Sequence, residues 1–213
     1  MIDKYIDILK CNIEKRKKRG IFLLSNSQMS DFWIDINEFT NFEAVNSLIQ
    51  ISTVVFKNIH KKQGRFTIVI PKYNGSSEKF FPVDYIIESA ISIGGSDGEI
   101  NTVYVTQSSE SGEFEISGSV VGYCVVVMAM SVHVVTLLRI IDLLESHGTK
   151  VDLVYNFICR ELVSIDLLAE RRIMAYAIMY ILGLTDNPTT YKETIEIKKD
   201  LSNRIKSIDW LED

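Results

Sequence analysis

Polar side chains that could hold an anionic ligand follow three hydrophobic segments of the sequence, at 65–71, 123–128 and 151–158. In chain order, these candidates are Lys72, Ser131, His133, Thr136 and Arg160. Lysine and arginine bind phosphate or carboxylate groups, and hydroxyl and imidazole groups can add hydrogen bonds. If the hydrophobic segments are parallel strands, ligands of such proteins bind beyond the carboxyl ends of the strands, so the turns after Ile70, Val105 and Val127 are the places to examine. We assign no catalytic residue.

Each candidate also has a structural interpretation. Lys72 is better explained as a solvated loop lysine, and His133 as a residue that caps or packs at a helix start, because no acid is paired with it. Arg160 could bind a carboxylate ligand or could form an ion pair with Glu161 or Glu170, and both interpretations stay open.

The elements that must position these residues follow from the hydrophobic pattern. Segments rich in Val and Ile alternate with amphipathic segments, which is typical of a parallel sheet covered on both faces by helices. We therefore predict an α/β fold with a central, mostly parallel sheet. The expected helices are 2–19, 41–62, 83–92, 133–147, 163–172 and one more beyond residue 186; the expected strands are two within 21–36, then 65–71, 100–106, 123–128, 151–158 and 173–182.

Composition narrows the class of protein. With 213 residues, 46% hydrophobic and 24% charged, the chain has enough apolar material for one domain with a core. A net charge of −5 argues against nucleic acid as a partner. The uncharged segment 118–138 is better explained as a strand that leads into a helix than as a membrane span.

The cysteines indicate the compartment. Cys11, Cys124 and Cys159 are not spaced as a metal site or a redox pair, which favours free thiols in a reducing cytoplasm. We expect a cytoplasmic protein with neither a metal ion nor a cofactor.

The order of the elements resembles the type I phosphoribosyltransferases, and most closely their orotate branch. Residues 26–35 (NSQMSDFWID) are similar to the pattern of that branch's amino-terminal hood. Residues 125–151 match, without a gap, the ribose-phosphate motif with its helix and the next strand. Residues 156–181 resemble the strand that ends in Asp-Arg, with its helix and the last strand. The resemblance extends from residue 1 to about 182 and implies the same fold.

The residues that perform the family's chemistry are mostly replaced. The resemblance places the two ribose-binding acids on Met128 and Ala129, which cannot accept hydrogen bonds from a diol. It places the phosphate-binding turn on residues 132–136, where only Thr136 keeps the family's residue type. Val134 and Val135 avoid positive φ, so we expect the helix to begin there instead of a phosphate cradle. The hood's lysine and glycine positions hold Ser25 and Ser27.

Two loops differ as well. The pyrophosphate loop at 71–82 is long and has a single glycine, and the catalytic loop begins Thr106-Gln107 where the family has Arg-Lys. The rest of this loop, 107–119, is acidic without a base, so it would repel pyrophosphate. Arg160 keeps the family's arginine, which meets the base's carboxylate, although its aspartate neighbour is replaced by Cys159.

The sequence therefore predicts a catalytically degenerate protein of the orotate phosphoribosyltransferase type, with a structural, regulatory or partner-binding role as a homodimer. One alternative is an active enzyme of pyrimidine nucleotide synthesis, and another is a sensor of a small ligand that uses Arg160 and His133. The expected domains are 1–185, including the hood at 21–36, and a helical extension at 186–213. Partner contacts are expected at the loop around Phe114 or at the extension, with self-packing of the extension favoured.

Overall fold

The computed structural model describes residues 2–23, 29–33, 41–73, 82–95, 99–108, 111–131, 134–159, 163–180 and 184–185. Six strands form the main sheet in the order β5-β4-β3-β6-β7-β8. All neighbouring pairs are parallel except β4 and β5, which are antiparallel. The strands are β3 (Phe66–Tyr73), β4 (Ile100–Gln107), β5 (Phe114–Ser117), β6 (Tyr123–Ser131), β7 (Leu153–Cys159) and β8 (Met174–Tyr180). The predicted α/β fold is confirmed.

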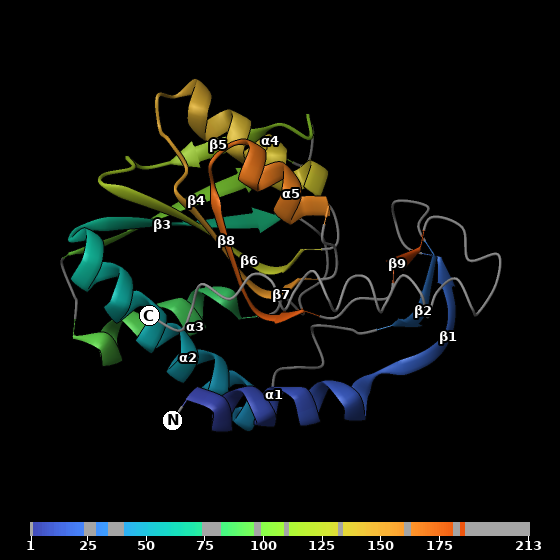
Figure 1. Cartoon of the computed structure of the whole chain (residues 1–213). Helices are drawn as coiled ribbons and strands as arrows, with labels where there is room; N and C mark the ends of the chain where they lie inside the picture. Colours follow the sequence, from blue (N-terminus) through green and yellow to red (C-terminus); the bar gives the residue numbers. More distant parts are fainter. Residues whose placement is uncertain are drawn as a thin grey trace.

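Helices cover both faces of this sheet (Figure 1). The helices on one face are α1 (Ile2–Arg16), α2 (Phe42–Gln63) and α3 (Val83–Gly94); those on the other are α4 (Val134–Ser146) and α5 (Val163–Glu170). Each face has its own hydrophobic cluster, because alternate residues of the strands point in opposite directions. The side chain of Asn41 caps α2 by accepting a hydrogen bond from the Ala44 N–H at 2.9 Å.

Aromatic rings fill the cluster under α2. Tyr155 of β7 is fully buried and lies 5.7 Å from Phe56 and 5.5 Å from Tyr176, measured between ring centroids. Its hydroxyl group lies 2.9 Å from the hydroxyl of Ser52, so the buried phenol has a partner. Burial raises the pKa of Tyr155 well above its usual value, which keeps this phenol neutral. We assign it to the core.

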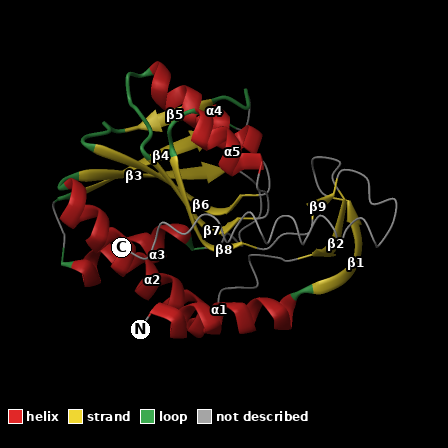
Figure 2. Ribbon diagram, in the orientation of Figure 1, coloured by secondary structure: helices red, strands yellow, loops and turns green. Residues whose placement is uncertain are grey.

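A second, small sheet stands apart from the main one (Figure 2). It contains β1 (Lys18–Leu23), β2 (Met29–Trp33) and β9 (Leu184–Thr185), all antiparallel. The first two are the pair of strands predicted for the hood. The third was not predicted, because a two-residue strand leaves no periodic signal in a sequence. Its pairing with β2 brings the end of the described chain back to the hood.

Strand β3 does not end at Pro71, as the sequence suggested, but continues to Tyr73. Its pairing with β4 extends to Tyr73, whereas its pairing with β6 ends at Val69. Proline has no N–H to donate, but beyond Val69 the strand has a paired neighbour on one side only. The strand can therefore contain Pro71 at this point. Within the described residues, the other predicted boundaries agree within about three residues, as is usual for helix and strand ends. The helical extension predicted at 186–213 lies outside the described residues.

Side chains tie the strands together at their amino ends. The carboxylate of Asp152 accepts a hydrogen bond from the Cys124 N–H at 2.9 Å, and the Cys124 carbonyl accepts one from the Asp152 N–H at 3.0 Å. Thr67 makes a similar reciprocal pair with the backbone of Val121, at 2.7 and 2.8 Å. Burial raises the pKa of the Cys124 thiol to about 12, so this cysteine is a protonated core residue.

Gly122 lies at this end and has a φ of 76°. A Cβ atom added to it would lie 2.3 Å from the carbonyl oxygen of Arg65, which is a backbone atom with little freedom to move. Glycine is therefore required here by both conformation and space.

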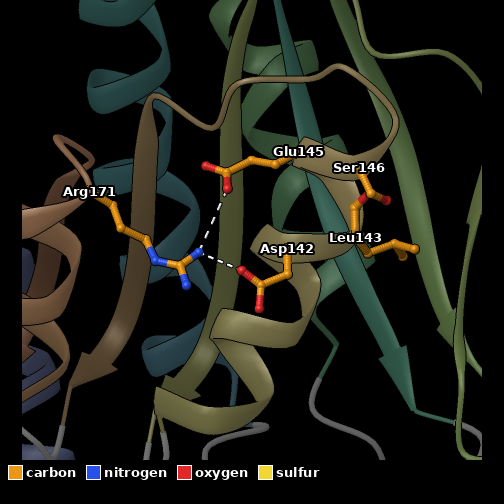
Figure 3. A network of polar contacts seen from close by, with 5 residues as sticks. All are labelled: Asp142, Leu143, Glu145, Ser146 and Arg171. Atoms are coloured by element: carbon orange, nitrogen blue, oxygen red, sulfur yellow. Dashed lines mark hydrogen bonds and ion pairs between the residues drawn. The ribbon is translucent and has the colours of Figure 1, made fainter.

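The helices are also tied at the amino ends of the strands. Arg171, which follows α5, lies 2.5 Å from the carboxylate of Asp142 and 3.7 Å from that of Glu145, both on α4 (Figure 3). The next residue, Arg172, has a φ of 59° and ends α5 in a left-handed turn. On the other face, the ring of His60 at the end of α2 lies 2.6 Å from Glu99, just before β4.

Candidate functional site

The sheet has a topological switch point between β3 and β6. From β3 the chain continues to β4 on one side, and the later strands β6, β7 and β8 lie on the other. Beyond Val69 and Val126 these two strands no longer pair, although each stays paired with its outer neighbour. Open α/β sheets bind ligands at such a point, outside the carboxyl ends of the strands. Of the predicted candidates, Lys72 lies near the end of β3 and Ser131 ends β6.

The end of β6 has no acid. Met128 is 6% exposed and belongs to the hydrophobic cluster beneath α4, while Ala129 is half-buried and packs on the opposite face. Met128 is therefore a residue of the hydrophobic core. Neither side chain can accept a hydrogen bond, so this strand end has no side-chain acceptor for a ribose diol at these positions.

The turn after β6 is short. Strand β6 ends at Ser131 and helix α4 begins at Val134, so only two residues separate them. Val134 and Val135 are helical, and Arg172 is the only residue other than glycine with positive φ in the described chain, which confirms the negative φ predicted for both valines. Thr136 is half-buried in the first turn of the helix. His133 lies outside the described residues.

Lys72 is held by its neighbours at the end of β3. Its Nζ atom lies 2.9 Å from the carboxylate of Asp84, in the first turn of α3, and 3.8 Å from the ring centroid of Tyr104 on β4. The hydrogen bond to Asp84 raises the pKa of Lys72, and burial raises the pKa of Tyr104. The ammonium group thus already interacts with a carboxylate and an aromatic ring. An anionic ligand would have to compete with both for it.

Sequence reasoning missed the partners of Lys72. Asp84 follows it by twelve residues, across a loop of unpredictable path, and Tyr104 belongs to another strand. The only available signal was the position of Asp84 in the first turn of a helix, where acids are favoured in any case. Nothing in the sequence connected the three residues.

Strand β7 contributes a buried amide. Asn156 is 4% exposed and lies beside Met128 of β6 and Ala177 of β8. No described residue donates a hydrogen bond to its Oδ1 atom, and an unsatisfied buried polar group costs about 1–3 kcal/mol. Sequence analysis did not single out Asn156, because one polar residue in an apolar strand does not reveal whether it has a partner.

Arg160 lies just beyond β7 and outside the described residues. The last residue of the strand, Cys159, is buried and pairs with Ser131 of β6, so the two strand ends are adjacent. This register places the predicted candidate Ser131 beside Cys159 at one edge of the sheet. Among the described residues, no group of His, Cys, Asp and Glu is arranged to hold a metal ion.

The segment 107–119 forms a hairpin between β4 and β5. Backbone hydrogen bonds join Ser108 N–H to Glu113 O at 2.8 Å and Gly112 N–H to Ser108 O at 3.0 Å. The side chain of Gln107 adds a bond to the Gly112 carbonyl at 3.0 Å. Phe114, which the sequence suggested as an exposed anchor, is half-buried and packs against the cluster beneath α4. This correction follows from strand alternation, which turns Glu113 and Glu115 outward instead.

No helix in the described part of the chain combines the length and the apolar character that a membrane span requires. Neither a family profile nor a curated protein matches the sequence.

Solved structures do match. Orotate phosphoribosyltransferase from Aeropyrum pernix is similar with a TM-score of 0.58 and 17% identity, covering 92% of this chain and 99% of that one. A phosphoribosyltransferase from Corynebacterium diphtheriae has a TM-score of 0.55 and 15% identity, covering 84% and 96%. Adenine phosphoribosyltransferase from Trypanosoma brucei has a TM-score of 0.56 and 13% identity, covering 81% and 79%.

The main sheet, its helices and the separate hood define the chain as a protein with the type I phosphoribosyltransferase fold. Within that class, the fold is of the orotate phosphoribosyltransferase type, as the sequence predicted.

Proposed function

We propose that this chain has kept the phosphoribosyltransferase fold without phosphoribosyl transfer, and that it has a structural, regulatory or partner-binding role as a homodimer. The observation that carries the proposal is the end of β6, where buried Met128 and half-buried Ala129 stand at the positions to which the sequence resemblance assigns the ribose-binding acids. An enzyme of this kind must stabilise a charged transition state, and one such contact is worth about 3–4 kcal/mol.

Two further features support the proposal. Lys72 is paired with Asp84 at the end of β3, and the hairpin that replaces the catalytic loop has exposed Glu113 and Glu115. A pyrophosphate site needs positively charged side chains that can bind the anion. Here the ammonium group of Lys72 is already paired, and Glu113 and Glu115 are negatively charged.

The surface proposed for a partner is the outer side of the hairpin at 107–119. Its backbone is fixed by its own hydrogen bonds, so it can present Glu113 and Glu115 in one arrangement without a large cost in ordering. The acids favour a partner with basic residues.

The direct test is calorimetric titration of the purified protein with phosphoribosyl pyrophosphate and magnesium. We expect no magnesium-dependent binding at millimolar ligand and no pyrophosphate-dependent loss of orotidine monophosphate. The alternative of an active enzyme predicts turnover near 1 per second or faster, which is the ordinary range for enzymes at the order-of-magnitude level. Such turnover would overturn the proposal.

The same titration distinguishes the third possibility, a small-ligand sensor at the switch point, from a purely structural role. A ligand bound without magnesium, and lost in Arg160→Ala and His133→Ala, would favour the sensor over a purely structural role. A matched control is Arg139→Ala, which removes an arginine from the middle of α4, away from the strand ends.

A further inference from the structure

The main sheet ends at β5, which is an edge strand. Among the described strands it pairs only with β4, and no other described strand lies on its outer side (Figure 1). The backbone N–H and C=O groups along an open strand edge can pair with an extended chain, which is a common way for proteins to bind a partner segment. The outer side of β5 is therefore a candidate interaction surface.

The hydrogen-bond register shows which residues face this open edge. The Ser108 N–H donates to the Glu113 carbonyl at 2.8 Å, so these two residues form a hydrogen-bonded pair. In an antiparallel ladder, such pairs alternate with pairs that are not hydrogen-bonded. Along β5, Glu115 therefore also directs its backbone groups toward β4, whereas Phe114 and Ile116 direct theirs away from it. The N–H and C=O groups of Phe114 and Ile116 thus face the open edge.

The side chains of the hairpin differ between its two faces. Glu113 and Glu115 are exposed on one face, while Phe114 and Ile116 are half-buried on the other, where they pack against the cluster beneath α4. A strand added beside β5 would continue both faces, and neighbouring side chains on one face of a sheet interact directly. The segment that fits has Lys or Arg next to the acids and apolar residues between them.

The charge of the hairpin also indicates which chain provides that segment. No Lys or Arg occurs from residue 80 to residue 138, a range that contains β4, β5 and β6. In a second copy of the chain, β5 would bring its own Glu113 and Glu115 to the pair, and like charges on adjacent strands oppose pairing. The acids therefore disfavour β5 of a second copy and favour a basic segment of another protein.

We propose that β5 binds an extended basic segment of a partner protein by strand addition. The partner backbone would pair with Phe114 and Ile116, and its basic side chains would lie beside Glu113 and Glu115. This inference rests on the proposed function, which places the partner surface on the outer side of the hairpin. Because β5 is only four residues long, the added strand is short and the binding should be weak and reversible.

The test is a nuclear magnetic resonance titration of the full chain with the peptide Lys-Val-Lys-Val-Lys-Val-Lys at up to millimolar concentration. At saturation we expect the Phe114 and Ile116 amides to exchange with solvent about tenfold more slowly, because they become hydrogen-bonded. The Glu115 amide already faces β4 and should keep its exchange rate. The control peptide Lys-Lys-Val-Val-Val-Lys-Lys has the same composition without the alternation. Equal effects of the two peptides, or unchanged Phe114 and Ile116 amides, would overturn the proposal.

A pair of variants tests the role of the charges. Glu113→Gln with Glu115→Gln should weaken binding of the alternating peptide about fivefold, because two cross-strand pairs of opposite charge are lost. The control is Glu43→Gln with Glu170→Gln, which makes the same change in net charge at exposed positions of α2 and α5. It should bind the peptide as the native chain does. Equal binding by all three proteins would contradict the proposed pairing.

The outcomes also distinguish this inference from the function on which it rests. Protected edge amides in a protein that transfers phosphoribosyl groups would support strand addition and overturn the proposed loss of activity. Binding of both peptides with unprotected edge amides would leave the acidic partner surface in place and overturn strand addition. Edge amides that become protected as the protein concentration rises, without any peptide, would show that a second copy covers β5, which would also overturn the proposal.

Discussion

The two ends of the main sheet are held together in different ways. At the amino ends of the strands, Asp152 and Thr67 make side-chain hydrogen bonds to the backbone of Cys124 and Val121, and Gly122 allows the Arg65 backbone to approach closely. At the carboxyl ends, the described polar contacts include the half-exposed pair of Lys72 with Asp84, and Asn156 has an unbonded oxygen. The contacts that stabilise the fold thus lie at the amino ends of the strands, away from the carboxyl ends where ligands of such sheets bind. Residues at the other end can change their chemistry without loss of the sheet.

The largest expected effect is at the amino end. Gly122→Ala places a methyl group against the Arg65 backbone in a left-handed conformation, and we expect it to lower the free energy of unfolding by about 3 kcal/mol or more. Gly148→Ala is the matched control, since its φ is 78° but no atom lies within 4 Å of the added Cβ; its cost should be about 1–2 kcal/mol. Urea denaturation measures both, and equal costs would show that the close approach at Gly122 is unimportant.

The second effect tests whether the lost acids can be restored. Met128→Asp puts a carboxylate into the cluster beneath α4 and should cost about 3 kcal/mol, whereas Ala129→Asp, at a half-buried position, should cost about 1 kcal/mol. Thermal melts compare the two variants with the native chain. A Met128→Asp protein of native stability that binds phosphoribosyl pyrophosphate with magnesium would show that this end of the sheet is still organised for the ligand.

A third change should stabilise the protein. Asn156→Leu removes the unbonded amide oxygen and keeps the number of heavy atoms, although the methyl groups are larger than the amide, and we expect the free energy of unfolding to rise by about 1 kcal/mol. Asn101→Leu is the matched control, because the Asn101 amide donates to the Ser119 carbonyl at 2.7 Å and its loss should lower stability slightly. If Asn156→Leu is destabilising by chemical denaturation, its amide has a partner in solution.

The smallest effect is expected for the ion pair at the carboxyl end. Lys72 and Asp84 have side chains 44% and 41% exposed, so Lys72→Ala should change the free energy of unfolding by about 0.5 kcal/mol or less. A double-mutant cycle with Asp84→Ala, measured at low and high salt, isolates the pair. A coupling above about 2 kcal/mol would mean that both ends of the sheet are secured to a similar degree.

The sequence predicted the main sheet well because its strands are local signals. Runs such as YCVVVMAMS in β6 and LVYNFIC in β7 are buried on both faces, and their spacing by amphipathic helices allows few other folds. The same reasoning correctly placed Val134 at a helix start. Each of these features depends on residues within one or two turns of chain.

Features that depend on distant residues could not be predicted. The partner of Lys72, the packing of Phe114 and the missing bond of Asn156 all depend on which elements become neighbours in space. The resemblance indicated which functional residues of the family are replaced in this chain. It did not indicate which residues the replacing side chains would contact. His133 and Arg160 lie outside the described residues, so their roles stay predictions.

The pairing of β2 with β9 also constrains how the protein is made. Met29 meets Thr185, 156 residues later in the chain, so the hood hairpin emerges from the ribosome long before its third strand exists. At about 5–20 residues per second, the wait is on the order of ten to thirty seconds. Contacts of such long sequence separation close late and slowly. The hood sheet is therefore completed only after residue 185 has been synthesised, and a chain stopped before residue 184 leaves β2 with an open edge.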